Sequence, residues 1–418
     1  MAERHVVVVG GGVIGLFCAL HARRQGYAVS LVERGAPDHD ACSLGNAGQI
    51  VPSHFEPLAA PGMAAMALRS VFNPASPVRV DPRLDFRFLR WGLNFVRSAT
   101  HEHVRRSSPL LRDYALLSRQ CYAELAELEG NTFGLAQQGL LMLPRTAQSM
   151  AQECIVAEKA NRLGIEAQIL SAQQARALEP AMQLEVAGAV LFPMDAHLVP
   201  QRLVALLTQR IQALGVHMLW ETTALGWRAA NNRVESLRTS RGEISADEYV
   251  MAVGAWTPAT LTGLRIRLPI EAGKGYSLDL EHPPVLPQRS FVLPEARIAV
   301  TPMAGTLRFA GTMQFAGLDT RIDARRVRAI VEAVPQYLPD FAAADFADAV
   351  PWTGLRPCTP DGLPFLGRSQ RYANFIVATG HALMGVSLGA ATGLLVGELL
   401  AGRTPSIALD MLRPERFC

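Results

Sequence analysis

The sequence predicts an α/β protein in which a parallel-sheet domain is interleaved along the chain with a β-rich domain of the α+β type. Val6–Val9 is a continuous β-branched run followed by glycines, which is typical of a strand buried on both faces of a parallel sheet. Strand patterns dominate from about 266 to 350, and the tail from 352 returns to glycine-rich loops and a strand at Ile376–Val377. No single boundary therefore separates the domains.

The composition bounds the size and the class of the protein. The chain has 418 residues, 49% hydrophobic and 18% charged, which fits two globular domains. The predicted segments are 1–85, 196–265 and 351–418 for the first domain, and 86–195 and 266–350 for the second. The net charge of +3 gives no basic field for nucleic acid. The six cysteines are scattered without metal-ligand spacing, so we expect free thiols and no metal site.

The remaining elements follow from periodicity and from turn residues. Helical spacing is expected over 13–25, 84–130, Gln201–Leu214 and from Arg325, and residues 35–62 read as a long functional loop. A hairpin is expected to turn at Asn231–Asn232. The other expected strands are Ala28–Val32, Leu140–Leu143, Ala189–Phe192, Tyr249–Val253, Tyr276–Leu280, Ile298–Thr301 and Leu307–Gly311.

The N-terminus carries the motif Gly10-x-Gly12-x-x-Gly15 between the first strand and the first helix. The first glycine permits a tight turn, the second lets the backbone approach a pyrophosphate, and the third allows close packing of helix on strand. Glu33 ends the second strand, where a carboxylate binds ribose hydroxyls and disfavours the 2′-phosphate of NADP. These residues predict a Rossmann-like dinucleotide-binding domain.

FAD suits this motif better than NAD. A second motif of the same kind, as a separate NAD(P)H domain would need, is absent from the sequence. The long loop at 35–62 and the glycine-rich segment 380–402 suit a long cofactor on which distant parts of the chain close. The segment 380–402 is also apolar enough to test as a membrane span, but its six glycines favour a loop that enters a buried helix.

Four sequence blocks resemble the FAD-dependent D-amino-acid dehydrogenases, relatives of D-amino-acid oxidase and glycine oxidase. They are VVVVGGGVIG with Glu33, SLGNAGQIVPSHFEPLAAPG (43–62), KGYSLDL (274–280), and WTGLRPCTPDGLPFLGR with GHALMGVSLGAATG (352–393). The blocks run in family order over nearly the whole chain. The variant GVSLGAATG also resembles relatives that act on 4-hydroxy-D-proline.

The resemblance implies positions for the cofactor-binding residues. The loop would lie along the pyrophosphate and flavin, Ala224 on the adenine side and Gly254 near the phosphates, while the C-terminal block would line the isoalloxazine. The residues so implied, together with those of the motif, are Gly10, Gly12, Val13, Ile14, Gly15, Glu33, Arg34, Ser43, Asn46, Ala47, Gly48, Gln49, Ala224, Gly254, Gly380, His381, Gly385, Val386 and Ser387.

Arg356 matches the family arginine that binds the substrate carboxylate. Its guanidinium, on a loop stiffened by Gly354, Pro357 and Pro360, also suits bidentate contact with a carboxylate. An interdomain ion pair is the alternative. Tyr276 is predicted either to line the substrate pocket or to be a core aromatic. His54 is predicted to shape substrate choice, and His381 to pack on the flavin rather than to act as an acid or base.

The resemblance implies oxidative deamination of a small D-amino acid by hydride transfer from the α-carbon to flavin N5. With no NAD(P)H domain, electrons would pass to a quinone, another carrier or O2. Oxidation of glycine or sarcosine, and a flavin-binding subunit without turnover, stay open. We expect a cytoplasmic protein, and the segment 84–100, in which Phe, Trp and Leu mix with Arg, either docks on the inner membrane or is a packed helix with a basic outer face.

Overall fold

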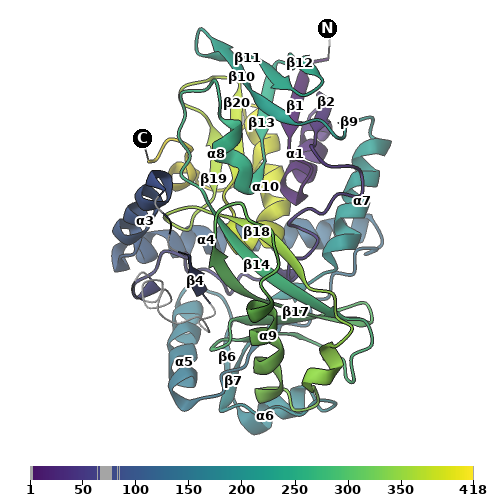
Figure 1. The fold of residues 1–418 in the computed structure, drawn as a ribbon, viewed down its shortest axis with the longest axis vertical. Helices are drawn as coiled ribbons and strands as arrows, with labels where there is room; N and C mark the ends of the chain where they lie inside the picture. Colours follow the sequence, from purple (N-terminus) through teal and green to yellow (C-terminus); the bar gives the residue numbers. More distant parts are fainter. Residues whose placement is uncertain (1–2, 64, 66–77, 82, 84, 418) are drawn as a thin grey trace.

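The computed structural model describes residues 3–63, 65, 78–81, 83 and 85–417. Two large sheets divide the molecule, one in the upper and one in the lower half of Figure 1. Both contain strands from distant parts of the chain, which confirms the predicted α/β architecture and its interleaved organisation.

The upper sheet has six strands, and its central strand β1 (His5–Val9) is buried on both faces as predicted. Val6 and Val8 belong to the core cluster on the helical side, whereas Val7 and Val9 belong to the cluster on the opposite side. All strands run parallel except β19. The order is β19 (Phe365–Arg368), β20 (Phe375–Thr379), β13 (Glu248–Met251), β1, β2 (Ala28–Val32) and β9 (His217–Leu219).

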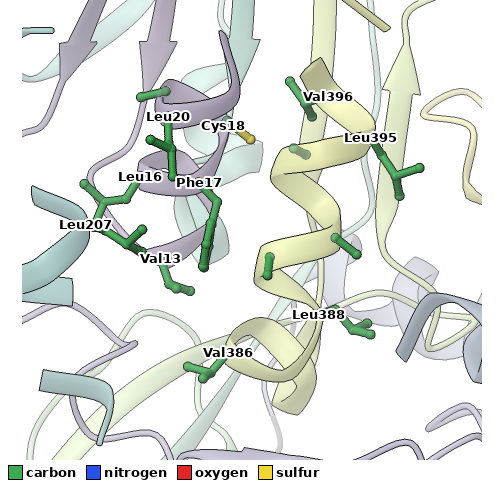
Figure 2. Packing of buried hydrophobic residues seen from close by; sticks show 14 of the residues in the cluster. Val13, Leu16, Phe17, Cys18, Leu20, Leu207, Val386, Leu388, Leu395 and Val396 are labelled. Carbon is green, nitrogen blue, oxygen red and sulfur yellow. The ribbon is translucent and has the colours of Figure 1, made fainter. Parts of the chain in front are cut away.

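Helices cover one face of this sheet. The first helix, α1 (Val13–Arg24), packs on the C-terminal helix α10 (Gly385–Leu400), and Figure 2 shows Phe17 between them. Gly393 permits this contact, since a Cβ there would lie 2.7 Å from Phe17 Cβ. Among the described residues only the segment Ala382–Leu400 is long and apolar enough to span a membrane. Its position between α1 and α4 (His101–Leu128) is that of a core helix, and α7 (Pro200–Ala213) packs on α1 in the same core.

A three-stranded sheet covers the other face of the upper sheet. It consists of β10 (Ala224–Ala230), β11 (Arg233–Thr239) and β12 (Gly242–Ile244). The turn between the first two strands lies at Asn231 and Asn232, both with positive φ, as a tight hairpin turn requires. The predicted hairpin is therefore confirmed.

The lower sheet has nine strands. Its order is β18 (Trp352–Cys358), β14 (Glu271–Leu280), β17 (Thr306–Phe315), β16 (Ile298–Met303), β15 (Ser290–Leu293), β5 (Leu140–Met142), β7 (Gly188–Phe192) and β6 (Gln168–Ser171), with β4 (Val78–Val80) paired to β17. One face packs on α6 (Ala172–Leu178) and α9 (Ala324–Ala333) in a second core. The helix α5 (Ala147–Arg162) packs beside β7.

Three elements lie elsewhere than the predicted segments placed them. The strands β4 and β18 pair in the lower sheet, although 1–85 and 351–418 had been assigned to the upper domain. The helix α4 packs on α10 of the upper domain, although 86–195 had been assigned to the lower one. The prediction of loops from 352 was wrong for β18, because its glycine and proline obscure the strand pattern. The elements α5, α6 and β19 were not predicted.

The smaller elements join these layers. The helix α3 (Phe86–Ser98) precedes α4 at the left edge of Figure 1, and residues 35–62 contain only the short strand β3 (Gln49–Ile50), which pairs with β8 (Ala196–His197). Short helical turns complete the chain at η1 (Gly254–Trp256), α8 (Thr257–Thr260), η2 (Val334–Gln336), η3 (Ala343–Phe346), η4 (Ala382–Met384) and η5 (Asp410–Leu412).

Candidate active site

A single large cavity of about 690 Å³ is lined by both sheets and by the loop that follows β2. Residues of the N-terminal glycine motif line one part of it, and residues of β14, β17 and β18 line another. The lining is mostly apolar with a few polar side chains, which is typical of a cofactor and substrate site. Segments far apart in the sequence thus meet around one space.

The first and third motif glycines are required by the backbone that surrounds them. Gly10 has φ +109°, and a Cβ there would lie 2.4 Å from the carbonyl oxygen of Ala252. A Cβ on Gly15 would lie 1.8 Å from the carbonyl oxygen of Gly10. Only glycine fits either position, so α1 can begin close to the carboxyl end of β1, where its N-terminus favours anions.

Three other glycines leave room in the cavity itself. A Cβ on Gly254 would meet no protein atom within 4 Å, one on Gly12 only Ser43 Oγ at 3.7 Å, and one on Gly385 only His381 Cβ at 3.9 Å. All three line the cavity. A side chain at these positions would fill the space that the residues leave, so the cradle fits a cofactor whose phosphates and rings approach the backbone closely.

The carboxylate predicted to bind ribose is fixed by the backbone around it. Glu33 is buried, and its two oxygens accept hydrogen bonds from the N–H groups of Gly11 at 2.6 Å and Gly35 at 2.8 Å. Beside it Arg34 stacks over the ring of Trp256 with 3.6 Å to the centroid, and Ala224 also lines this end. The arrangement suits the adenosine half of a dinucleotide.

The loop after β2 is held by its own polar side chains. Ser43 Oγ accepts a hydrogen bond from Val13 N at 3.1 Å, and Asn46 Oδ1 accepts one from Gly48 N at 2.8 Å. Gln49 Nε2 donates to the Phe291 carbonyl at 3.1 Å, which ties the loop to the lower sheet. Ser43, Asn46, Gln49 and the intervening Ala47 line the cavity, whereas Gly48 packs against Leu198.

The C-terminal block closes the cavity near α10. His381 is buried, its Nε2 lies 3.1 Å from Thr392 Oγ1, and burial lowers its pKa to about 3. A neutral imidazole in this position suits packing against a ring better than acid or base chemistry, and the role of His381 at the flavin stays a prediction. His381, Gly385 and Val386 line the cavity, but Ser387 Oγ instead accepts a hydrogen bond from Val51 N.

Arg356 on β18 reaches into the cavity across a glycine of the neighbouring strand. A Cβ on Gly275 would lie 2.2 Å from Arg356 Cζ, so the side chain lies directly over that residue. Its Nη1 donates to the Thr312 carbonyl at 2.8 Å. Burial lowers the pKa of Arg356, yet arginine stays charged. This half-buried cation in the cavity wall can bind a carboxylate.

The carbonyl that orients Arg356 belongs to a strained residue. Thr312 has φ +58°, which is an outlier for a β-branched side chain. It lies at a β-bulge where Gly311–Gln314 of β17 face only Lys274–Tyr276 of β14. Strain of this kind is found at functional sites. The sequence carries no signal for this bulge.

Tyr276 is not part of the cavity wall, and the predicted substrate-binding role is wrong. Its side chain is buried in the core between the lower sheet and α9, and its hydroxyl lies 2.9 Å from Gln314 Oε1. Alternation along β14 explains the difference, because Gly275 faces the cavity and its neighbour therefore faces away. The core alternative for Tyr276 holds.

Most of the other predicted residues meet at the cavity. Gly15, Gly48, Gly380 and Ser387 act behind its wall, and Gly380 has φ +82°. Those that line it are Gly10, Gly12, Val13, Ile14, Glu33, Arg34, Ser43, Asn46, Ala47, Gln49, His54, Ala224, Gly254, His381, Gly385, Val386 and Arg356. Cavity residues that sequence reasoning missed include Cys42, Trp91, Trp256, Gly275 and Thr312.

Comparison with known proteins identifies the family to which this site belongs. Residues 5–399 match the family profile described as DAO, FAD dependent oxidoreductase. The chain belongs to this family of FAD-dependent oxidoreductases. It is 33% identical to the D-amino acid dehydrogenase of Methylobacterium radiotolerans, with 99% of each chain covered, and 31% identical to that of Granulibacter bethesdensis, with 96% and 97% covered.

The fold agrees with solved structures of the same kind. Glycine oxidase from Geobacillus kaustophilus superposes with a TM-score of 0.80 at 23% identity over 99% of each chain. The L-proline dehydrogenase of P. horikoshii superposes with a TM-score of 0.73 at 18% identity. As an FAD-dependent oxidoreductase, the protein would hold its cofactor in the glycine cradle, with Glu33 at one end and the C-terminal block at the other.

Proposed function

We propose that this FAD-dependent oxidoreductase oxidises a small D-amino acid at the α-carbon and yields the imino acid. The observation that carries the proposal is Arg356, a half-buried cation in the wall of the same cavity that contains the glycine cradle. The names of the curated relatives, D-amino acid dehydrogenases at 31–33% identity, support the same substrate class. FAD supplies the acceptor for the two electrons of the reaction.

The protein's own residues bind and orient the substrate. Arg356 would pair with the α-carboxylate, and the Thr312 carbonyl fixes the guanidinium by accepting from Nη1. The apolar side chains Met142, Val292 and Ile298 also line the cavity, so they exclude water and favour a small side chain. Orientation and exclusion of water contribute most of the rate enhancement in such a site.

The first test is anaerobic reduction of the bound flavin by a panel of amino acids. We expect one small D-amino acid to bleach the flavin absorbance at least about 100-fold faster than its L-enantiomer, because a fixed carboxylate and a shaped pocket present only one face of the α-carbon. The panel includes 4-hydroxy-D-proline, glycine and sarcosine. Bleaching by glycine or sarcosine alone would favour an amine oxidase, and flavin that no amine bleaches would contradict the proposal.

We further propose a membrane quinone as the electron acceptor, reached from the cytoplasmic face. The helix α3 exposes Phe86, Leu89, Leu93 and Val96, each more than half exposed. Their spacing places them on one side of the helix, and the exposed side chains Arg87, Arg90 and Arg97 flank them. On the opposite side Trp91 and Phe95 are buried and line the cavity. This apolar and basic face fits an anionic bilayer surface.

Sedimentation with vesicles tests the membrane proposal. We expect the protein to sediment with vesicles of anionic phospholipid and to be released by salt, because basic side chains near the surface each contribute about 1 kcal/mol. The double change Leu89→Gln and Leu93→Gln should abolish binding and leave flavin reduction intact. Val350→Gln, which alters an exposed apolar residue away from α3, is the matched control. Equal sedimentation of all three proteins, or none by the unmodified protein, would overturn docking by α3.

A further inference from the structure

We propose that His54, Ser53 and Asp195 form a proton relay that takes the proton from the substrate's ammonium group before the oxidation. The proposal rests on the proposed function, since it concerns the amine of that substrate. An α-amino acid enters mainly as the ammonium ion at neutral pH, and the nitrogen lone pair is available only after this proton has left. A group in the cavity that accepts it therefore accelerates the reaction.

The three side chains form a continuous hydrogen-bonded chain from the cavity into the protein. His54 lines the cavity, and its Nδ1 lies 3.1 Å from Ser53 Oγ. Ser53 Oγ lies 2.5 Å from Asp195 Oδ2, and Ser53 N donates to Asp195 Oδ1 at 3.1 Å. Ser53 and Asp195 are buried, so the far end of the chain is shielded from solvent.

The location of His54 suits contact with the substrate. Its neighbours Val51 and Phe55 pack in one core cluster with Leu140 of β5 and Phe192 of β7. Met142 and Val292 pack against this cluster and also line the cavity. The histidine is therefore placed where the lower sheet, which carries Arg356, meets the cavity.

The hydrogen bonds determine which nitrogen of His54 is free. Ser53 has one hydroxyl proton, and a carboxylate at Asp195 can only accept it. Ser53 Oγ must then accept from His54, so the proton of the neutral imidazole resides on Nδ1. The lone pair is left on Nε2, the nitrogen available to the cavity. With Asp195 ionised, His54 is thus a hydrogen-bond acceptor toward the substrate.

The relay moves one proton and no electrons. The N–H bond of the substrate ammonium breaks and an Nε2–H bond forms on His54. The Nδ1 proton passes to Ser53 Oγ, and the hydroxyl proton passes to Asp195 Oδ2. The substrate becomes a neutral amine, His54 stays neutral with its proton on Nε2, and Asp195 becomes a neutral acid. The reverse sequence returns the proton to water after the product leaves.

The ionisation properties of the two ends fit this direction of transfer. His54 is accessible within the cavity, but enclosure by protein lowers its pKa to about 4. The imidazolium form is therefore unfavourable, and His54 does not retain the proton that it accepts. Burial raises the pKa of Asp195 to about 7, against the hydrogen bonds from Ser53 and the charge of Arg119 on α4. The charged groups of α5 near this loop are Glu153 and Lys159, and the latter pairs with Glu56.

The test is the pH dependence of anaerobic flavin reduction, measured with the best amine substrate of the unmodified enzyme. His54→Gln should slow reduction by about 100-fold at pH 8, the range of general base catalysis. The deficit should shrink to a few-fold near pH 10, where much of the substrate already enters as the free amine. A deficit that is equal at both pH values, or no deficit at pH 8, would overturn the relay.

Three further variants separate the relay from a structural role. Asp195→Asn is nearly isosteric, and its amide can donate a hydrogen bond to Ser53 Oγ. The Ser53 hydroxyl then donates to His54 Nδ1, so the proton of the neutral imidazole lies on Nε2 and this nitrogen can no longer accept a proton from the substrate. It should show the same pH-dependent deficit, and its rate should fall steadily with the free-amine fraction from high pH downward, without the separate inflection near pH 7 that Asp195 gives the unmodified enzyme. Ser53→Ala should behave likewise, and Ser53→Thr should restore the rate.

Flavin absorbance and the unfolding temperature verify that each variant is folded. If His54→Gln loses FAD, the pH profile of Asp195→Asn decides between the relay and a structural role. Failure of every amine to reduce the unmodified enzyme would instead refute the proposed function.

Discussion

Replacing Arg356 by methionine is expected to raise the KM for the amino-acid substrate by about 30-fold or more, because loss of one partner of a charge pair enclosed in a binding site costs about 2–5 kcal/mol. The cation lies in the cavity wall and is oriented by the Thr312 carbonyl. Lysine should not restore binding, since it lacks the planar donor pair. Steady-state kinetics with the best substrate measure the effect. FAD content, measured by absorbance, should not change.

Gly275→Ala tests the same contact while Arg356 is retained. The new Cβ would lie 2.2 Å from Arg356 Cζ, so the guanidinium must move away from its position over β14. We expect KM to rise in the same direction as in Arg356→Met, and the double variant to show little further loss, because the two changes act on one interaction. An unchanged KM in Arg356→Met would refute the carboxylate contact.

Gly10→Ala is expected to abolish FAD retention and to lower the free energy of unfolding by about 3 kcal/mol or more, through left-handed strain and a forced backbone shift. The clash is with the carbonyl of Ala252, 2.4 Å from the added Cβ. Gly26→Ala is the matched control, because Gly26 also has positive φ, +82°, but no atom lies within 4 Å of an added Cβ. The control should lose about 1 kcal/mol and keep FAD. Denaturant unfolding and flavin absorbance measure both effects, and equal losses would contradict the steric argument.

The sequence predicted those parts of the fold in which a short stretch of residues is enough to indicate burial or a turn. Val6–Val9 reads as a doubly buried strand because every position is apolar, and two asparagines with positive φ close the predicted hairpin. The same logic failed for Tyr276. A strand of mixed glycine and aromatic residues does not reveal which face meets the cavity. In the structure Arg356 of β18 pairs with Gly273 of β14, and its guanidinium lies over Gly275, two residues further along the strand.

Other features of the site depend on contacts that no local pattern encodes. Ser53 and Asp195 are 142 residues apart and meet through a side-chain hydrogen bond. The bulge at Thr312 arises from the register between β14 and β17, and its positive φ is imposed by the sheet. Propensity would not place a threonine there. These parts of the site therefore depend on contacts between residues far apart in the sequence, which local composition does not predict.

The packing of α1 against α10 has a consequence for how the molecule reaches its native state. The helix α1 is synthesised long before α10, but its apolar face, including Phe17, is covered by residues 385–400. Its strand β1 also pairs with β13, about 240 residues later. Contacts between such distant segments slow folding and leave apolar surface exposed in the meantime. The apolar face of α1 therefore stays uncovered until α10 has been synthesised, and during that interval we expect it to be a target for chaperone binding.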